Sequence, residues 1–384
     1  NLNVPHLRFT EFSGEWKKCI IQDYGEVITG NTPPTNNAEY YNNGSYLWAS
    51  PADLGTGKKI NDTKTKLSES GFKKTRIIPK GSILVTCIGS TIGKIGMAVE
   101  TMSSNQQINS IIVNEKSNND FVYYAISRAF PRYLSEVGVQ AVPILSKSNF
   151  EKLPNYTTSI EEQDKTGYFL NLLDERIATQ NKIIEDLKKL KCAIIEKLYS
   201  KIQGKEYSYG QLFDVVNERN KQMEYYNILS ASQEKGMVNR DDLNLDIQFE
   251  RSNINTYKIV RKGDYVIHLR SFQGGFAFSD KLGVCSPAYT ILRPNSLLEY
   301  SYLSYYFTSQ RFIKSLIIVT YGIRDGRSIN VEEWLNMKVV IPSKEHQLHT
   351  LNVLKRIDDK VENEEKYATC LSNQKQYLLR QMFI

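Results

Sequence analysis

The feature that most constrains this chain is an internal repeat that covers about half of its length. Two segments, from about Glu161 to Ile202 and from about Lys344 to the C-terminus, carry apolar residues at alternating spacings of three and four, the pattern of a helix buried along one stripe. Every position of the second stripe lies 184 residues after its counterpart, so the repeat predicts two equivalent long helices. The first stripe is Leu170, Leu173, Ile177, Gln180, Ile184, Leu187, Lys191, Ile194 and Leu198, and the second is Leu354, Ile357, Val361, Glu364, Ala368, Leu371, Lys375, Leu378 and Met382.

The segments that precede the two helices also correspond. Residues 79–85 resemble 261–267, and 109–113 resemble 289–292; each first pair is a polar turn that feeds a β-branched apolar run. The sequence therefore predicts an α+β fold, with two tandem mixed α/β, mostly-sheet domains separated by two long antiparallel coiled-coil helices and related by a pseudo-two-fold axis. The predicted bounds are 1–158 for the first domain, 159–204 for the first helix, 205–342 for the second domain and 343–384 for the second helix.

Helix length gives this arrangement a scale. A helix of about 40 residues is about 60 Å long, and an antiparallel pair would carry the two domains at its opposite ends. One turn of B-DNA is about 34 Å, so two such domains would address two half-sites more than one turn apart. Apolar residues outside the two stripes predict a wide apolar band on the first helix that docks further partners: Phe169, Leu172, Ile183, Ile195 and Tyr199.

Composition agrees with a polyanionic partner. The net charge is +7 and the pI is about 8.9. Five cysteines are scattered without a C-x-x-C pair, which predicts reduced thiols in a cytoplasmic protein. No run of 18 apolar residues occurs, so we expect no membrane span.

A search for catalytic motifs finds only partial matches. The segment Gly89–Lys94 has three residues between its glycines where a phosphate-binding loop has four, and Ile95 stands where Ser or Thr would touch Mg²⁺. A tight turn between strands is the preferred interpretation. The segment Asn31–Thr35 lacks the aromatic residue of an amino-methyltransferase motif, and we interpret it as a loop.

The remaining chemical candidates are equally weak. Glu364 and Lys366 have the E-x-K spacing of many nucleases, but a charged helix face explains them better. His346 and His349 lie one helical turn apart without a third ligand nearby, so we predict no metal site. The chain is therefore predicted to carry no catalysis of its own.

Basic and amide side chains in loops are the candidates for contacts with DNA, because such groups bind phosphates and base edges. In the first domain they are Lys58, Lys59, Lys73, Lys74, Arg76, Ser90, Thr91, Lys94, Asn105, Gln106 and Gln107. In the second domain they are Arg219, Lys221, Arg270, Ser271, Gln273, Tyr321, Arg324 and Arg327.

Several segments, in this order and with the two helices, resemble one known family, the specificity subunits of type I restriction–modification enzymes. The resemblance covers essentially the whole chain and is carried by Pro5–Phe9, Gly14–Trp16, Gly81–Val113 with Asn105–Asn109, and Leu378–Ile384. It implies that each domain reads one half of a bipartite double-stranded DNA target while the helices set the spacing.

The resemblance also implies partners. Two methyltransferase (modification) subunits would dock on the helices, and two motor-nuclease (restriction) subunits would complete the full complex. S-adenosylmethionine, ATP and Mg²⁺ are expected in those subunits and no cofactor in this chain. Two alternatives stay open: a stand-alone DNA methyltransferase or nuclease with a fused recognition domain, and a scaffold that does not bind DNA.

Overall fold

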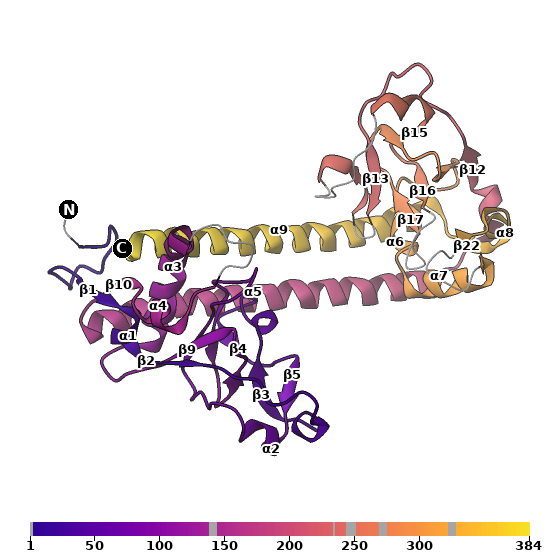
Figure 1. The fold of residues 1–384 in the computed structure, drawn as a ribbon. Coiled ribbons are helices and arrows are strands. Elements are labelled where there is room, and N and C mark those ends of the chain that lie inside the picture. The colour runs from indigo at the N-terminus through magenta and orange to yellow at the C-terminus, as the bar shows by residue number, and fades with distance from the viewer. Residues whose placement is uncertain (1–2, 138–143, 233–234, 243–250, 269–274, 322–327) are drawn as a thin grey trace. The chain divides into compact units, whose positions relative to one another are not determined.

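The computed structural model describes residues 3–137, 144–232, 235–242, 251–268, 275–321 and 328–384 (Figure 1). The chain divides into two compact units, which are described separately: unit 1 is Asn1–Asn181 with Lys366–Ile384, and unit 2 is Lys182–Glu365. The two long helices, α5 (Ile160–Ser200) and α9 (Lys344–Met382), each contribute one part to either unit. No helix among the described residues is both long and apolar enough to cross a membrane.

The stripes predicted from the repeat are the contact face of these helices. All nine stripe positions on each helix are buried or half-buried, and most positions between them are exposed. In unit 1, Asp174 of α5 forms an ion pair with Lys375 of α9. In unit 2, Lys191 of α5 pairs with Asp358 of α9 at 2.5 Å. Higher numbers on one helix meet lower numbers on the other, so the pairing is antiparallel in each unit, as predicted.

Unit 1 is built on a five-stranded sheet of order β2-β9-β6-β7-β4. Its strands are β2 (Gly25–Thr29), β4 (Lys59–Ile60), β6 (Ile83–Thr86), β7 (Ile95–Ala98) and β9 (Ile108–Val113). A second sheet has the order β5-β3-β8, and β1 pairs with β10. These strands are β1 (Lys17–Ile20), β3 (Tyr46–Ala49), β5 (Thr65–Leu67), β8 (Ser103–Ser104) and β10 (Pro154–Thr157), and the short helices are α1 (Ile21–Tyr24), α2 (Glu69–Phe72), α3 (Asn119–Val137) and α4 (Lys147–Glu151).

Unit 2 repeats this plan with a four-stranded sheet of order β12-β19-β16-β17. Its strands are β12 (Phe213–Val216), β16 (Tyr265–Ile267), β17 (Phe276–Phe278) and β19 (Thr290–Pro294). Two-stranded pairs surround it: β11 (Lys205–Ser208) with β22 (Lys338–Ile341), β13 (Leu229–Ser232) with β14 (Gly236–Asn239), β15 (Lys258–Val260) with β18 (Gly283–Cys285), and β20 (Thr320–Tyr321) with β21 (Ser328–Ile329). Its helices are α6 (Tyr302–Tyr306), α7 (Gln310–Ser315) and α8 (Val331–Asn336).

The central strand of each sheet is buried on both faces. In β6, Ile83 and Val85 join the core that contains helix α3, while Leu84 joins a separate core on the other face. In β16, Tyr265 and Ile267 belong to one core and Val266 to another. Successive strand residues point to opposite faces, which is why these strands are continuous apolar runs.

The two units thus share sheet order, helix pairing and core pattern, and the predicted α+β fold is confirmed. One detail of the sequence interpretation is wrong. Ile195 and Tyr199 do not belong to an outward apolar band: they are 3% and 4% exposed and lie in the core of unit 2. Phe169 packs against the core of unit 1, whereas Leu172 and Ile183 are exposed as expected.

Candidate nucleic-acid interface

Strand register in unit 1 brings four chain segments to one end of the five-stranded sheet. Thr29, the last residue of β2, pairs with Asn109 near the start of β9. Thr86, the last residue of β6, pairs with Ile108, and Val85 pairs with Ile95 at the start of β7. The segments 30–32, 87–94 and 105–107 therefore leave the sheet at the same end, which we call the loop end of unit 1.

Polar contacts join the segments of this loop end. The Thr32 hydroxyl donates a hydrogen bond to Oε1 of Gln106. Asn31 donates from Nδ2 to the Lys74 carbonyl at 2.9 Å and accepts from the Arg76 backbone N–H at 2.8 Å. The Arg76 guanidinium in turn donates to the Thr29 carbonyl at 2.7 Å. These bonds hold Lys74 and Arg76, which follow α2, against the end of β2.

The segment between β6 and β7 is a hairpin loop, as the sequence interpretation preferred. Gly93 adopts φ +91°, and its N–H donates to the Thr86 carbonyl at 2.9 Å. A Cβ at Gly93 would lie 2.6 Å from the Phe130 ring, so only glycine fits there. The loop presents Ser90 and Lys94 to solvent.

The predicted residues at the loop end differ in exposure. Lys74, Arg76, Ser90, Lys94 and Gln106 are exposed, and Thr91 and Gln107 are half-buried. Asn105 is only 8% exposed, and its side chain accepts from the Gln107 N–H at 3.0 Å, so it shapes the loop. Lys73 is exposed but forms an ion pair with Glu69 of α2 at 2.6 Å.

Lys58 does not lie at the loop end, and we withdraw it from the predicted DNA contacts. Its side chain is 3% exposed, and its Nζ lies 2.5 Å from Oδ1 of Asp120. Nζ also donates to Oδ1 of Asn171 on α5 at 2.8 Å and to the Tyr124 hydroxyl at 3.3 Å. Burial lowers the pKa of Lys58, and the hydrogen bond to Asp120 opposes that shift. A lysine held in this way has no free ammonium for a phosphate.

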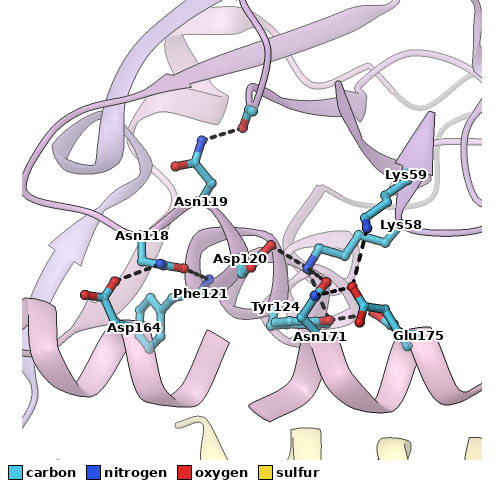
Figure 2. Close-up of polar contacts among 12 residues, drawn as sticks. Lys58, Lys59, Asn118, Asn119, Asp120, Phe121, Tyr124, Asp164, Asn171 and Glu175 are labelled. Atoms are coloured by element: carbon cyan, nitrogen blue, oxygen red, sulfur yellow. Dashed lines mark hydrogen bonds and ion pairs between the residues drawn. The ribbon is translucent and has the colours of Figure 1, made fainter. Parts of the chain in front are cut away.

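Figure 2 shows that Lys58 belongs to the seat of the unit 1 domain on α5. Lys59 reaches Glu175 of α5 at 3.5 Å, and Asn118 donates to Asp164 of α5 at 2.8 Å. Lys59 is exposed and its ion pair is open to water, so it stays a predicted contact only in the sense that nothing buries it.

The same register argument holds in unit 2. Val216 at the end of β12 pairs with Ile291, and Ile267 at the end of β16 pairs with both Thr290 of β19 and Phe276 of β17. The segments that follow β12 and precede β19 therefore leave the sheet at one end, the loop end of unit 2.

Two predicted residues follow β12 at this end. Arg219 and Lys221 are exposed and flank Asn220, which is 2% exposed. The Asn220 side chain donates to the Tyr225 carbonyl at 2.7 Å and so folds this loop. The predicted contacts Arg270, Ser271, Gln273, Arg324 and Arg327 lie outside the described residues, as does the side chain of Tyr321.

A repeated triad that joins each domain to both long helices was not predicted. In unit 1 the Tyr124 hydroxyl donates to Asp174 of α5 at 2.6 Å, and Asp174 pairs with Lys375 of α9. In unit 2 the Tyr305 hydroxyl donates to Asp358 of α9 at 2.7 Å, and Asp358 pairs with Lys191 of α5 at 2.5 Å. The signal was present: Lys191 and Lys375 are the matching polar interruptions of the apolar stripes.

A glutamine at the start of each long helix is also repeated. Gln163 accepts from the Asn118 N–H at 3.0 Å, and Gln347 accepts from the Glu299 N–H at 2.7 Å. Both are 1% exposed. The repeat therefore preserves the bonds that fix each domain to its helix as well as the sheet.

No cluster of three or more His, Cys, Asp or Glu suited to a metal ion occurs among the described residues. His346 and His349 therefore have no described carboxylate or thiol partner set. What the two loop ends offer is recognition chemistry: exposed cations, amides and hydroxyls displayed by rigid strands.

Comparison with known proteins identifies a family. Residues 13–189 match the model of the type I restriction modification DNA specificity domain. A curated relative, the type I restriction enzyme HindI specificity subunit of Haemophilus influenzae, is 32% identical over 151 residues, which are 38% of this chain and 32% of that protein. The chain thus matches about a third of that relative's length.

Two other comparisons span nearly the whole chain. The MjaVIII specificity subunit of Methanocaldococcus jannaschii is 23% identical over 397 aligned positions, covering 95% of this chain and 91% of that protein. A crystal structure of a type I restriction-modification S subunit from M. genitalium is similar with a TM-score of 0.57 at 16% identity, covering 99% of both chains. The latter similarity concerns the fold.

Proposed function

We propose that this chain, which belongs to the family of type I restriction–modification specificity subunits, reads a bipartite double-stranded DNA target, with one half-site at the loop end of each unit. The observation that carries the proposal is the register of the two central sheets. In each unit, antiparallel pairing sends polar loops to a single end of a buried sheet. A rigid sheet with variable loops at one end suits base recognition, because loops can change without disturbing the core.

Unit 1 offers a sorted set of contacts at its loop end. Lys74, Arg76 and Lys94 are exposed cations suited to phosphates, and Gln106 is an exposed amide suited to base edges. Gln106 is also held by Thr32, so its side chain is positioned before DNA arrives. In unit 2, Arg219 and Lys221 occupy the corresponding end of the sheet.

We further propose that the helices set the spacing of the half-sites and dock two methyltransferase subunits, which two motor-nuclease subunits join in the full complex. Exposed apolar residues on α5 support a docking role: Tyr168, Leu172, Ile183 and Leu190 are 64%, 44%, 41% and 52% exposed. The chain itself is proposed to be non-catalytic, with S-adenosylmethionine, ATP and Mg²⁺ bound by its partners in the cytoplasm.

The proposal is tested by co-expressing the chain with the adenine methyltransferase subunit of its genome and selecting bound duplexes from a random pool. Two short motifs at one fixed spacing are expected. Uniform binding that only falls with salt would show a non-specific binder, and no binding would favour a scaffold. Methylation of DNA by the isolated chain would instead favour a stand-alone enzyme.

Variants at the two loop ends assign the motifs. Gln106→Ala is expected to relax the requirement at one motif, and Arg219→Ala at the other motif or in overall affinity. Lys58→Met is the matched control, because Lys58 is a cation of the same domain that lies in the helix seat. It is expected to leave both motifs unchanged.

A further inference from the structure

Unit 1 seals one end of its core with a tryptophan. The Trp16 ring lies 5.5 Å from the Phe121 ring and 5.8 Å from the Phe383 ring, between centroids. Trp16 is 2% exposed, and its Nε1 donates to Oε1 of Glu162 at 3.2 Å. Phe121 comes from the domain and Phe383 from the residues just after α9, so the indole joins the domain to the helix pair.

The internal repeat supplies a counterpart for each of the two phenylalanines. Tyr302 of α6 stands for Phe121, and Tyr199 near the end of α5 stands for Phe383. The Phe121–Phe383 pair has a centroid distance of 5.2 Å and an interplanar angle of 40°. The Tyr199–Tyr302 pair has 5.5 Å and 47°, so the two ring pairs have the same geometry.

The tryptophan itself has no counterpart. Strand pairing fixes the equivalence, since Lys17 pairs with Thr157 in unit 1 and Lys205 with Ile341 in unit 2. The residue before Lys205, in the place of Trp16, is Gly204. A Cβ there would lie 2.2 Å from the Ile341 carbonyl oxygen, so unit 2 cannot supply an indole from this position.

A cavity of about 270 Å³ opens in unit 2 against these two tyrosines. Its walls include Ile202, Val339 and Val340, and the exposed cations Arg311 and Lys338 also line it. The volume lies just below the range of about 300–1,000 Å³ that holds drug-sized ligands, which favours a single side chain over a free metabolite.

Tyr302 adds a polar feature that its counterpart Phe121 lacks. Tyr302 is 1% exposed, and its hydroxyl has no hydrogen-bond partner among the described residues. A buried polar group without a partner is unusual in a native protein and calls for a missing ligand atom. The nearby cations favour an aromatic ring, because ammonium and guanidinium groups are attracted to its face.

We propose that this cavity binds a tryptophan side chain of a partner subunit, which completes unit 2 as Trp16 completes unit 1. The occupant's indole N–H or a neighbouring backbone group would give the Tyr302 hydroxyl its partner. The inference goes beyond DNA recognition and rests on the proposed function only in naming the methyltransferase subunit as that partner.

The cavity is tested with indole as the probe on the full 44.1 kDa chain, observed through its methyl NMR signals. Saturable shifts are expected for Ile202, Val339 and Val340, with methyl groups of unit 1 unchanged. Ile202→Trp fills the cavity from within and is expected to abolish them. Absence of saturable shifts, or equal shifts in the filled variant, would overturn the proposal.

The internal copy provides a matched control. Trp16→Ala empties the equivalent position in unit 1 and is expected to create a second indole site there, reported by methyl groups near Phe121. If that variant does not fold, Val340→Trp serves as a second way to fill the unit 2 cavity, with the same expected loss of binding. Indole that still binds to both filled variants would place the probe elsewhere and refute the assignment.

The partner is tested by the affinity of the methyltransferase subunit for the chain. Ile202→Trp and saturating indole are each expected to weaken it at least tenfold. Unchanged affinity would overturn the proposed occupant. That result would leave DNA recognition untouched, because motif selection by the assembled complex is measured separately.

Discussion

Replacing Asp120 by Asn is expected to destabilise unit 1 more than replacing Lys58 by Met, although both changes break the same ion pair. The Lys58 side chain is 3% exposed and that of Asp120 is 31% exposed. Asp120→Asn leaves a buried ammonium without its counter-charge. Lys58→Met leaves a carboxylate that water can reach, and a chain of similar length fills the space.

The magnitudes follow from these exposures. Removing one partner of a fully buried pair costs about 3–5 kcal/mol, and the access of water to Asp120 reduces this to about 2–3 kcal/mol for Asp120→Asn. In Lys58→Met the other partners keep bonds of their own, since Asn171 also donates to Glu175 and Tyr124 to Asp174. We expect a cost of about 1 kcal/mol or less.

Urea unfolding of the full chain, followed by hydrogen exchange in α3 and α5, measures both costs within unit 1. A larger loss for Lys58→Met than for Asp120→Asn would refute the reasoning. DNA binding gives an independent arm: Lys94→Met should reduce the slope of log K against log salt by about one, and Lys58→Met should not change it. A reduced slope in Lys58→Met would return Lys58 to the DNA contacts.

Three further outcomes are expected. Tyr124→Phe should cost about 1–2 kcal/mol, and Tyr305→Phe less, because Asp174 is 19% and Asp358 37% exposed; equal costs in urea unfolding would contradict this. Burial raises the pKa of Glu162, but hydrogen bonds from Arg8, Thr158 and Trp16 outweigh it and hold that pKa below the ordinary 4.5. Its charge therefore stabilises the fold at neutral pH and ceases to do so as the pH falls below 4.5, so Glu162→Gln should flatten the acid side of the stability curve measured by unfolding; a curve as steep as the unmodified protein's would contradict this. Gln106→Ala should change base preference without changing the salt slope, and a fall in slope would reassign it to phosphate.

The long helices could be predicted from the sequence because their signal is local. Apolar spacing of three and four depends only on neighbouring turns, and the repeat at 184 residues confirmed it independently. The polar interruptions Lys191 and Lys375 were visible too. Their partners Asp358 and Asp174 were not, because finding them requires the register between two helices distant in sequence.

The candidate site was predictable in part. Composition indicated which loops carry cations and amides, but only strand register shows that the segments around Asn31, Ser90 and Gln106 meet at one end of a sheet. Lys58 was misassigned because its neighbours in sequence are polar, while its partner Asp120 lies 62 residues later. A residue's charge says nothing of its burial until tertiary contacts are known.

The central claim is that two recognition units in one chain read two half-sites at a fixed separation. Its most direct test is the affinity of the assembled complex for duplexes that carry both selected motifs and differ only in spacer length. Each added base pair rotates one motif by about 34–36° relative to the other. We predict a sharp affinity maximum at a single spacer, with tenfold or greater loss at one base pair on either side. Equal affinity across spacers would contradict the account.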